Sequence, residues 1–373
     1  MSVLEEIIRD EIAERGPMGF ARYMDLALYH PEHGYYASGR RRTGWQGQFV
    51  TSPELDPAYG ELWAAGFEDV WEQCGRPSTF TLIEVGPGEG SFAAAVLDAA
   101  NGYFAEALEV VLVERVEAVR ARQRQVLDHH NNVSWISSLD EARNVECGCL
   151  FANELVDNLP VAIAEKRAGN LVELCVGMSG SELGLVARPP SDGILTFTRG
   201  MQAQLPDGHR IEVPLAAMQF ASVATGTIGR GAIVLVDYGD DEAGLVQRPA
   251  GTLLCYSDAG VDDRYLEAPG TKDITAHANW SALIRAFGDA GASVAGPKPQ
   301  RDVLKSLGAD DLHDRFKRAA DEALQRGSGA AGVRAISRRG ALGALLDPAG
   351  LGGLGVLVAL TGIPAPDFMA APG

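Results

Sequence analysis

Four short apolar segments alternate with more polar, helix-like segments between residues 80 and 152, and this alternation limits the fold more than any other feature of the sequence. The apolar segments span 80–85, 110–113, 133–136 and 149–152. Strands that alternate with helices form a parallel sheet with helices on both faces. A fifth apolar segment, 233–236, resumes the pattern later in the chain. The sequence therefore predicts an α/β fold built on a doubly wound sheet.

The alternation is interrupted once, and the ends of the chain differ from it. Residues 160–230 carry strand-like and hairpin-like patterns, which we interpret as an insertion. Segments near 252–256 and 293–295 are expected to complete the sheet. The expected parts of the chain are a helical and loop cap at 1–75, a core at 76–300 with the insertion at about 160–230, and a helical segment at 301–373.

The chain is acidic, with 50 Asp and Glu residues against 32 Lys and Arg residues and a formal net charge of -18. Nucleic-acid binding relies on basic patches and on the release of counterions from phosphates, so nucleic acid is not expected as a partner. The same excess argues against anionic membrane surfaces. It is compatible with a cationic substrate, although proteins that bind nothing basic are often equally acidic.

The spacing of cysteines and histidines shows no metal or disulfide pattern. The five cysteines form no C-x-x-C pair and the seven histidines no H-x-x-x-H pair, which predicts a reducing compartment and no metal site. The N-terminus lacks the pattern of a signal peptide. Glycines interrupt the longest uncharged run, 348–366, so it is too short to span a membrane. These features predict a cytoplasmic protein without a membrane anchor.

A glycine-rich loop joins the first strand of the alternation to the helix that follows. It reads Glu84-Val85-Gly86-Pro87-Gly88-Glu89-Gly90. Glycines allow sharp turns and let a ligand lie against the backbone, and the next helix presents the positive end of its dipole. The spacing G-x-G-x-G is one residue shorter than the dinucleotide pattern G-x-G-x-x-G, which disfavours a dehydrogenase. A purely structural turn would use the same glycines.

A second acidic residue, Glu114, ends the next apolar strand. Doubly wound folds place a carboxylate at this point, where it accepts hydrogen bonds from the hydroxyls of a ribose. Alone, Glu114 is also explained as a solvated helix cap. Together with the glycine loop on the preceding strand, it favours a ligand of the adenosine type. The short loop favours S-adenosylmethionine over NAD.

In these and other motifs the sequence resembles the MidA-type, S-adenosylmethionine-dependent methyltransferases, a family whose mitochondrial member is a respiratory complex I assembly factor that methylates arginine. The similar segments follow one another along nearly the whole chain: GFARYM (19–24), Pro31 with GYY (34–36), GQFVTSPE (47–54), the glycine loop (84–90), Glu114 with Arg120 and Gln123, ANE (152–154) with Asp157 and Leu159-Pro160, DYG (237–239), DITAH (273–277), and Gln300 with Leu304. The resemblance implies a class I methyltransferase fold, Rossmann-like and doubly wound, with S-adenosyl-L-methionine as the cofactor. Because it begins near residue 1, it implies a bacterial, cytoplasmic member without a transit peptide.

Four positions depart from the pattern of the family. Gln48 stands where the family usually has Asp, and Glu89 where it usually has Arg. Leu254 and Ala259 occupy positions that are basic or histidine in the family. These departures concern the acceptor more than the cofactor.

The cofactor is expected at the carboxyl ends of the parallel strands. The loop backbone should contact the methionine part of the cofactor, with Glu84 near its ammonium group. Glu114 should hold the ribose, and residues that follow the third strand should border the adenine. The predicted cofactor-binding residues are Glu84, Gly86, Pro87, Gly88, Gly90, Glu114, Ser138 and Leu139.

An arginine acceptor has a pKa above 12, so it needs carboxylates that grip the guanidinium and accept its proton. Asn153 and Glu154 end the fourth strand and should face the sulfonium and the acceptor. Glu154 and Asp157 are the candidate carboxylates, with Glu54 as a third, although Asn153 and Asp157 are also explained as capping residues. His277 is a candidate general base, and its alternative is a structural histidine.

Thr51, Ser52 and Glu54 are expected to form part of a lid or substrate loop. The predicted function is methylation of a protein arginine. One alternative is a methyltransferase of the same fold for a small molecule or an oxygen acceptor. Another is an assembly factor that binds the cofactor and a partner protein with little turnover. The sequence is compatible with a homodimer and leaves the acceptor and the degree of methylation open.

Overall fold

The computed structural model describes residues 1–38, 51–142, 145–201 and 205–370, and the chain forms two compact units. Unit 1 comprises Met1–Phe49, Val156–Ala221 and Gly239–Ala286. Unit 2 comprises Val50–Leu155, Ser222–Tyr238 and Phe287–Gly373. Each unit is therefore assembled from stretches that are far apart in the sequence.

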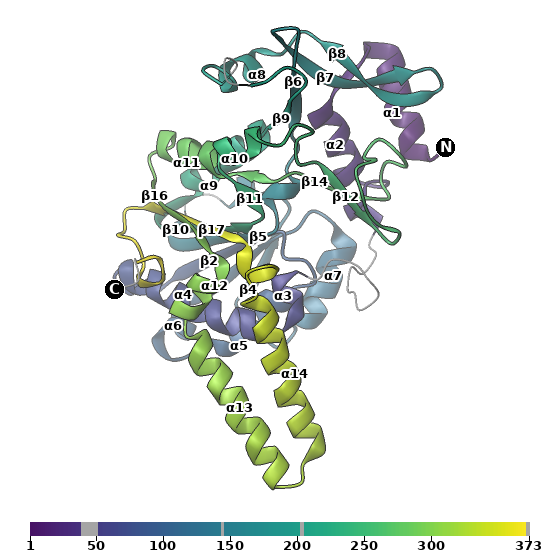
Figure 1. Cartoon of the computed structure of the whole chain (residues 1–373). Coiled ribbons are helices and arrows are strands. Elements are labelled where there is room, and N and C mark those ends of the chain that lie inside the picture. The colour runs from purple at the N-terminus through teal and green to yellow at the C-terminus, as the bar shows by residue number, and fades with distance from the viewer. Residues whose placement is uncertain (39–50, 143–144, 202–204, 371–373) are drawn as a thin grey trace. The chain divides into compact units, whose positions relative to one another are not determined.

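Unit 2 is built on a seven-stranded sheet with the order β16-β17-β10-β5-β2-β3-β4 (Figure 1). The strands are β2 (Phe80–Val85), β3 (Leu108–Val113), β4 (Val133–Ile136), β5 (Val145–Asn153), β10 (Ile228–Asp237), β16 (Ser293–Pro299) and β17 (Gly355–Thr361). The five strands from β4 to β10 are mutually parallel, whereas β17 is antiparallel to both of its neighbours. The strand order reverses between β2 and β5, and ligands of such sheets bind at this switch point.

Two features of this sheet differ from what the sequence indicated. Residues 301–373, expected to be mostly helical, are helical over much of their length but also contribute β17, which lies between β10 and β16. A strand buried on both faces reads as a continuous apolar run, which periodicity cannot distinguish from a packed helix segment. The segment near 252–256 does not join this sheet, because β12 (Leu254–Ser257) belongs to a separate sheet in unit 1.

Two helices of unit 2, α4 (Ala58–Gln73) and α5 (Ser91–Ala99), cover one face of the sheet with an aromatic core. The rings of Phe92 and Phe151 stack with centroids 4.5 Å apart. Trp63 and Phe67 of α4 pack edge-on against Phe151. The remaining helices of this unit include α3 (Ser52–Leu55), α6 (Gly102–Ala107), α7 (Glu117–Val126), α12 (Gln300–Ser306), α13 (Ala309–Gln325) and α14 (Gly329–Leu345). The last two form an extended antiparallel hairpin (Figure 1).

Unit 1 contains the strand-rich insertion, as the sequence predicted. Its largest sheet is antiparallel, with the order β1-β7-β6-β9 and β8 paired to β7. These strands are β1 (Met18–Gly19), β6 (Ala162–Arg167), β7 (Asn170–Ser179), β8 (Glu182–Arg188) and β9 (Arg210–Val213). Two smaller sheets pair β12 with β13 (Gly260–Asp262) and β14 (Asp273–Thr275), and β11 (Gly239–Asp240) with β15 (Ala278–Asn279).

The N-terminal helices α1 (Val3–Arg15) and α2 (Phe20–Tyr29) supply much of the core of unit 1. Leu4, Ile8 and Phe20 are buried there together with Leu174 of β7. Helices α8 (Asp192–Phe197) and α10 (Glu242–Val246) also lie in this unit, whereas α9 (Leu215–Thr227) and α11 (Trp280–Asp289) each contribute residues to both units. Among the described residues, none of the helices has the length and apolar character needed to cross a membrane.

Candidate active site

The glycine loop between β2 and α5 has a backbone that glycine adopts far more readily than other residues. Gly86, Gly88 and Gly90 have φ angles of +73°, +51° and +84°, in the left-handed region. A Cβ on Gly86 would lie 3.2 Å from Leu155 Cδ1, and one on Gly90 would lie 3.3 Å from Gln123 Cγ. Gly90 is the N-cap of α5. The loop thus ends at a helix N-terminus, which favours a negatively charged ligand group.

Two contacts from α7 fix this loop. The buried side chain of Gln123 donates to the backbone oxygen of Gly88 over 2.8 Å and accepts from Trp135 Nε1 over 2.9 Å. The carboxylate of Glu89 accepts two hydrogen bonds of 2.8 Å from Arg122. Glu89, where the family usually has Arg, is therefore held by an ion pair that links the loop to α7.

Glu84 lies at the carboxyl end of β2, directly before the loop. Its side chain is buried, and its Oε2 accepts no hydrogen bond from any described residue. Burial raises the pKa of Glu84 to about 8. A buried acid of this kind becomes easier to ionise when a cation such as an ammonium group comes close. The side chain therefore fits the role of a partner for the amino group of the cofactor.

Glu114 and Ser138 follow β3 and β4 at the same edge of the sheet. The Oε1 of Glu114 accepts from the N–H of Val116, the N-cap of α7, over 2.8 Å. Ser138 caps a short turn by accepting from the N–H of Asp140 over 3.3 Å, and Leu139 in this turn is buried. The structure places these predicted ribose and adenine contacts on neighbouring strand ends, and their binding roles stay predictions.

Glu154 follows β5 with a φ of +49°, a conformation that costs a residue with a side chain about 1–2 kcal/mol. Its N–H donates to the backbone oxygen of Val236 in β10 over 2.8 Å. Its Oε1 accepts from the N–H of Ser52 over 3.2 Å and from Asn153 Nδ2 over 3.0 Å. These contacts hold the carboxylate at the ends of β5 and β10.

Two further buried residues connect the groups that donate to Glu154. The hydroxyl of Tyr59 lies 2.8 Å from Asn153 Oδ1 and 2.8 Å from Gln300 Oε1. Gln300 Nε2 donates to Ser52 Oγ over 3.2 Å. The hydrogen bonds form a closed set, which we call the Glu154 network: Glu154, Asn153, Tyr59, Gln300 and Ser52.

Carboxylates gather around this network. Burial, followed by the charge of Asp237, raises the pKa of Glu154 to about 8, and Glu54 acts in the same direction. The hydrogen bonds from Ser52 and Asn153 oppose this shift. Asp237 is fully buried at the end of β10. Crowded, buried carboxylates favour protonation or a neighbouring cation, so this place suits a guanidinium or a sulfonium.

The predicted substrate loop is described from Thr51 onward. Thr51 is the N-cap of α3, and Ser52 and Glu54 lie within this helix. The backbone N–H of Ser52 donates to the carboxylate of Glu154, and the charge of Glu54 contributes to raising the pKa of Glu154. Gln48, one of the departures from the family, lies outside the described residues.

Asp157 and His277 belong to unit 1, so the predicted acceptor residues are divided between the two units. The backbone oxygen of Asp157 accepts from the N–H of Ala276 over 2.8 Å. The N–H of His277 donates to Thr252 Oγ1 over 2.9 Å. Burial, and then the charge of Arg248, lower the pKa of His277. The structure thus links Asp157 to the neighbour of His277, and their catalytic roles stay predictions.

Unit 1 holds a polar cluster to which the sequence analysis gave no role. The hydroxyl of Tyr36 lies 2.6 Å from Asn158 Oδ1 and 2.9 Å from Asp273 Oδ1, and Asn158 Nδ2 donates to the same Asp273 oxygen over 2.9 Å. Tyr29 stacks on Tyr36 with ring centroids 5.3 Å apart. This cluster could have been suspected from the sequence, because Tyr36 and Asp273 both lie in segments that resemble the family.

Sequence reasoning also missed the contacts of Tyr59, Gln123 and Gln300. Tyr59 is inconspicuous within a helical segment, whereas Gln123 and Gln300 are among the residues that match the family, without a role assigned to either. Two of the departures from that family, Leu254 and Ala259, lie in or next to the β12–β13 hairpin of unit 1.

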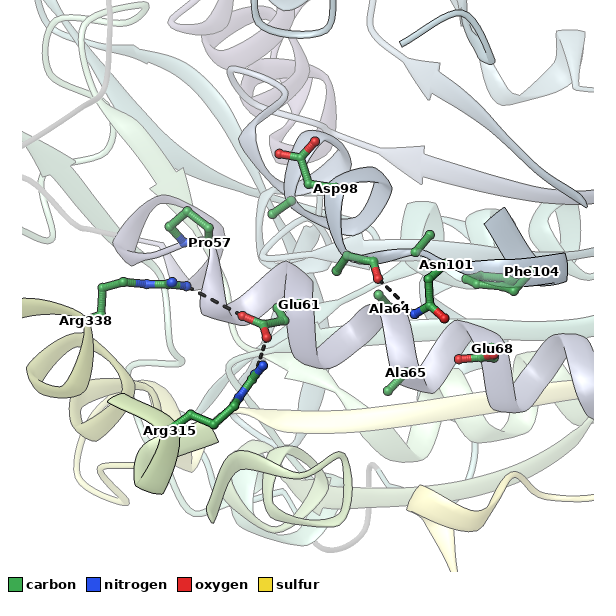
Figure 2. Close-up of a pocket in the computed structure, with 13 residues that line it drawn as sticks. Pro57, Glu61, Ala64, Ala65, Glu68, Asp98, Asn101, Phe104, Arg315 and Arg338 are labelled. Carbon is green, nitrogen blue, oxygen red and sulfur yellow. Dashed lines mark hydrogen bonds and ion pairs between the residues drawn. The ribbon is translucent and has the colours of Figure 1, made fainter. Parts of the chain in front are cut away.

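A cavity of about 480 Å³ lies elsewhere in unit 2, lined by residues of α4, α5 and the α13–α14 hairpin (Figure 2). On its wall, Glu61 accepts a hydrogen bond from Arg315 and lies 3.6 Å from Arg338. Arg338 also donates to Asp56 Oδ1 over 3.1 Å. These arginines are already paired with carboxylates, and no predicted site residue lines the cavity. The strand ends, rather than this cavity, therefore form the candidate active site.

The strand order of unit 2 and the antiparallel β17 define a class I, S-adenosylmethionine-dependent methyltransferase, and the glycine loop at the switch point is where such a fold binds its cofactor. Residues 62–298 match the family described as "Putative S-adenosyl-L-methionine-dependent methyltransferase". The match covers more than half of the chain, and the chain belongs to this family. The resemblance to the MidA-type methyltransferases is thereby confirmed.

Solved structures and curated relatives agree with this assignment. A Burkholderia thailandensis protein crystallised with S-adenosyl-homocysteine bound is 28% identical, with a TM-score of 0.86 over 99% of this chain and 95% of that chain. The protein arginine methyltransferase NDUFAF7, mitochondrial, of zebrafish (Danio rerio) is 27% identical over 83% of this chain and 77% of its own length. Its human counterpart is 28% identical over 80% of this chain and 72% of its own length.

Proposed function

We propose that this methyltransferase acts on the arginine side chain of a protein. The observation that carries the proposal is the group of carboxylates at the ends of β5 and β10, where burial and the charges of Asp237 and Glu54 raise the pKa of Glu154 to about 8. A guanidinium is a planar cation that carboxylate oxygens grip in pairs. The relatives that are named protein arginine methyltransferases support the same acceptor.

The bound cofactor supplies an electrophilic methyl group on a sulfonium. The residues present fit it: Glu84 offers a buried carboxylate for the ammonium group, and the N-terminus of α5 offers a positive dipole for the carboxylate. Glu114 would accept hydrogen bonds from the ribose hydroxyls, and Ser138 and Leu139 would border the adenine. The main contribution of the chain is alignment and the exclusion of water.

Glu154 would hold the guanidinium and take up its proton. With the donor bound, a guanidinium nitrogen would take the methyl group from the sulfonium, whose bonding electron pair would stay on sulfur, and Glu154 would accept the one proton that this nitrogen loses. Because the guanidinium stays protonated at neutral pH, the reaction needs a proton acceptor that is close and aligned. The raised pKa of Glu154 brings it nearer to that of the guanidinium than an ordinary carboxylate would be. Asp157 and His277 are proposed as the acceptor-side groups of unit 1.

Radiolabelled methyl transfer tests the proposal. The full chain is incubated with methyl-labelled S-adenosylmethionine and a cell extract, and labelled proteins are hydrolysed in acid. We expect a labelled protein band whose hydrolysate contains methylarginine. Glu154→Gln should reduce this label by at least about 100-fold, because it removes the proton acceptor.

Glu212→Gln is the matched control. Glu212 is a second glutamate whose pKa is raised by burial, and its carboxylate accepts from the N–H of Thr252 over 2.8 Å. Its variant should keep the arginine label. Label in a small molecule would contradict the proposal and indicate a small-molecule acceptor. Label that mild alkali releases from protein would also contradict it and indicate a carboxyl acceptor. Normal binding of S-adenosyl-homocysteine without any label would favour an assembly factor.

A further inference from the structure

Three potential metal ligands meet at one edge of unit 2, away from the glycine loop. They are Asp98 in the last turn of α5 and the consecutive residues His129 and His130, which follow α7. Their ligand atoms all lie within 4.8 Å of one another. Asp98 Oδ1 is 3.5 Å from His129 Nε2 and 3.2 Å from His130 Nε2. The sequence gave no sign of this group, because Asp98 is far along the chain from the two histidines.

These separations match the geometry of a tetrahedral ion. Zinc binds imidazole nitrogen and carboxylate oxygen at about 2.0–2.2 Å, so two such ligands on a tetrahedron lie about 3.3–3.5 Å apart. The distances from Asp98 Oδ1 to the two Nε2 atoms are close to this value. A bound ion would therefore need only small movements of these side chains.

The surroundings of the histidines also favour a metal ion. Nδ1 of His129 lies 3.3 Å from Asp128 Oδ1, so a carboxylate can fix the tautomer that presents Nε2 to a metal. Nε2 of His130 is buried and lies 3.2 Å from Asp98 Oδ1, but it makes no hydrogen bond of suitable geometry to any described residue. The group lies at the C-terminal end of α5 and just beyond that of α7, where helix dipoles attract cations. Figure 2 shows the Asp98 carboxylate directed away from Glu61 and its two arginines.

The two imidazole rings lie side by side, with centroids 4.1 Å apart, so both Nε2 atoms reach the same Asp98 oxygen. One carboxylate oxygen and two imidazole nitrogens are a common set of protein ligands for zinc. We propose that Asp98, His129 and His130 bind a divalent transition-metal ion of the zinc type, with water in the fourth position.

The position of the site suggests what the ion would do. Gly90 caps the start of α5, and Gln123 of α7 donates to the backbone oxygen of Gly88 over 2.8 Å. The two helices joined by the ion are therefore the same two that hold the glycine loop. The ion would tie them together at a second point and stabilise the folded chain.

Calorimetric titration of the untagged, chelator-treated full chain with ZnCl₂ tests the proposal. Wild type should bind one equivalent of Zn²⁺, and Asp98→Asn and His130→Ala should weaken this binding by more than about 100-fold. Asp128→Asn should weaken it by about tenfold, as expected for a partner of a ligand. Co²⁺ should give the visible absorption of a tetrahedral complex in wild type only. The melting temperature of wild type should rise with added Zn²⁺.

His313→Ala is the matched control, because Nδ1 of His313 lies 3.7 Å from Asp314 Oδ1 and these two residues belong to no group of three ligands among the described residues. This variant should bind Zn²⁺ like wild type. The proposal is overturned if wild type takes up no Zn²⁺, or if Asp98→Asn and His130→Ala bind it as tightly as wild type, which would place the ion at other residues such as the cysteines.

Discussion

The hydroxyl of Tyr59 lies 2.8 Å from Oε1 of Gln300, a residue that begins α12 far along the sequence. The same hydroxyl contacts Asn153, and Gln300 donates to Ser52. Asn153 and Ser52 are the two residues that donate to the carboxylate of Glu154. Tyr59 and Gln300 therefore position Glu154 without touching it, and they hold it although its backbone is in an unfavourable conformation.

Tyr59→Phe should uncouple this network. The substitution removes one hydroxyl and leaves buried polar atoms of Asn153 and Gln300 with one contact fewer, which should lower the free energy of unfolding by about 1–2 kcal/mol. Because Glu154 is then held less firmly, we expect kcat for methyl transfer to fall about tenfold. Affinity for S-adenosyl-homocysteine should stay unchanged. Urea denaturation, initial rates and calorimetry measure the three quantities.

Tyr103→Phe is the control for this experiment, since Tyr103 is 81% exposed. It should change none of the three quantities. A Tyr59→Phe variant that loses stability but keeps kcat would show that the network supports the fold and does not position Glu154.

The ionisation of Glu84 should make stability depend on pH. Its folded pKa of about 8 lies above the value of about 4.3 expected in an unfolded chain, so the folded protein retains a proton that the unfolded chain loses. The stability that this proton contributes is complete below about pH 4 and is lost as the pH rises through about 8. The loss between these limits is up to about 1.4 kcal/mol per pH unit. Glu84→Gln should flatten this dependence in urea unfolding of the ligand-free protein.

Cofactor binding should release the same proton. The ammonium group of S-adenosyl-homocysteine favours ionised Glu84, so binding at pH 7 should release protons into the buffer. Calorimetry in buffers of different ionisation enthalpy measures this release. Glu84→Gln should abolish the release and weaken binding, whereas Glu154→Gln should leave most of it. Equal proton release from wild type and Glu84→Gln would refute the contact between Glu84 and the ammonium group.

Much of the sheet of unit 2 could be predicted because its signals are local. The expected segments 80–85 and 133–136 coincide with β2 and β4. The segment at 149–152 is the most apolar part of the longer β5, whose first residues include Glu146 and Gly148. The strand β17 is also an apolar run, but because it is buried on both faces its sequence does not alternate, and periodicity does not distinguish it from a packed helix segment.

The same division holds for the candidate site. Residues at strand ends, such as Glu84, Glu114 and Glu154, could be chosen from the sequence because parallel strands place their carboxyl ends at one edge. The contact between Tyr59 and Gln300 depends on how α4 and α12 pack in unit 2, and no spacing in the sequence reports it. The residues that could not be chosen from the sequence, Tyr59 and Gln300, are therefore those that position Glu154.

Glycine substitutions should separate backbone strain from steric exclusion in the cofactor loop. Gly86→Ala places a Cβ 3.2 Å from Leu155 at a φ of +73°, so it should weaken binding of S-adenosyl-homocysteine strongly, by about 100-fold. The Cβ of Gly88→Ala meets no atom of the described residues within 4 Å, and its strain of about 1–2 kcal/mol should weaken binding less. Gly75→Ala, at the end of α4, carries similar strain away from the loop. It should lower the melting temperature alone, and equal binding losses in all three variants would contradict a local role of the loop.

The pH dependence of turnover should distinguish Glu154 from Glu84. At saturating cofactor, Glu84 is already ionised by the ammonium group, so kcat/KM for the acceptor reports the remaining groups of the enzyme–cofactor complex. Glu154 must be ionised to accept a proton, and its pKa is about 8 without ligand. A bound sulfonium lowers this pKa, so kcat/KM should rise by up to about tenfold per pH unit and level off at a pH below 8. Glu154→Gln should give a low, flat profile and Glu212→Gln the wild-type profile. If the rise persisted in Glu154→Gln, another group would titrate, and Glu154 would have no part in the proton transfer.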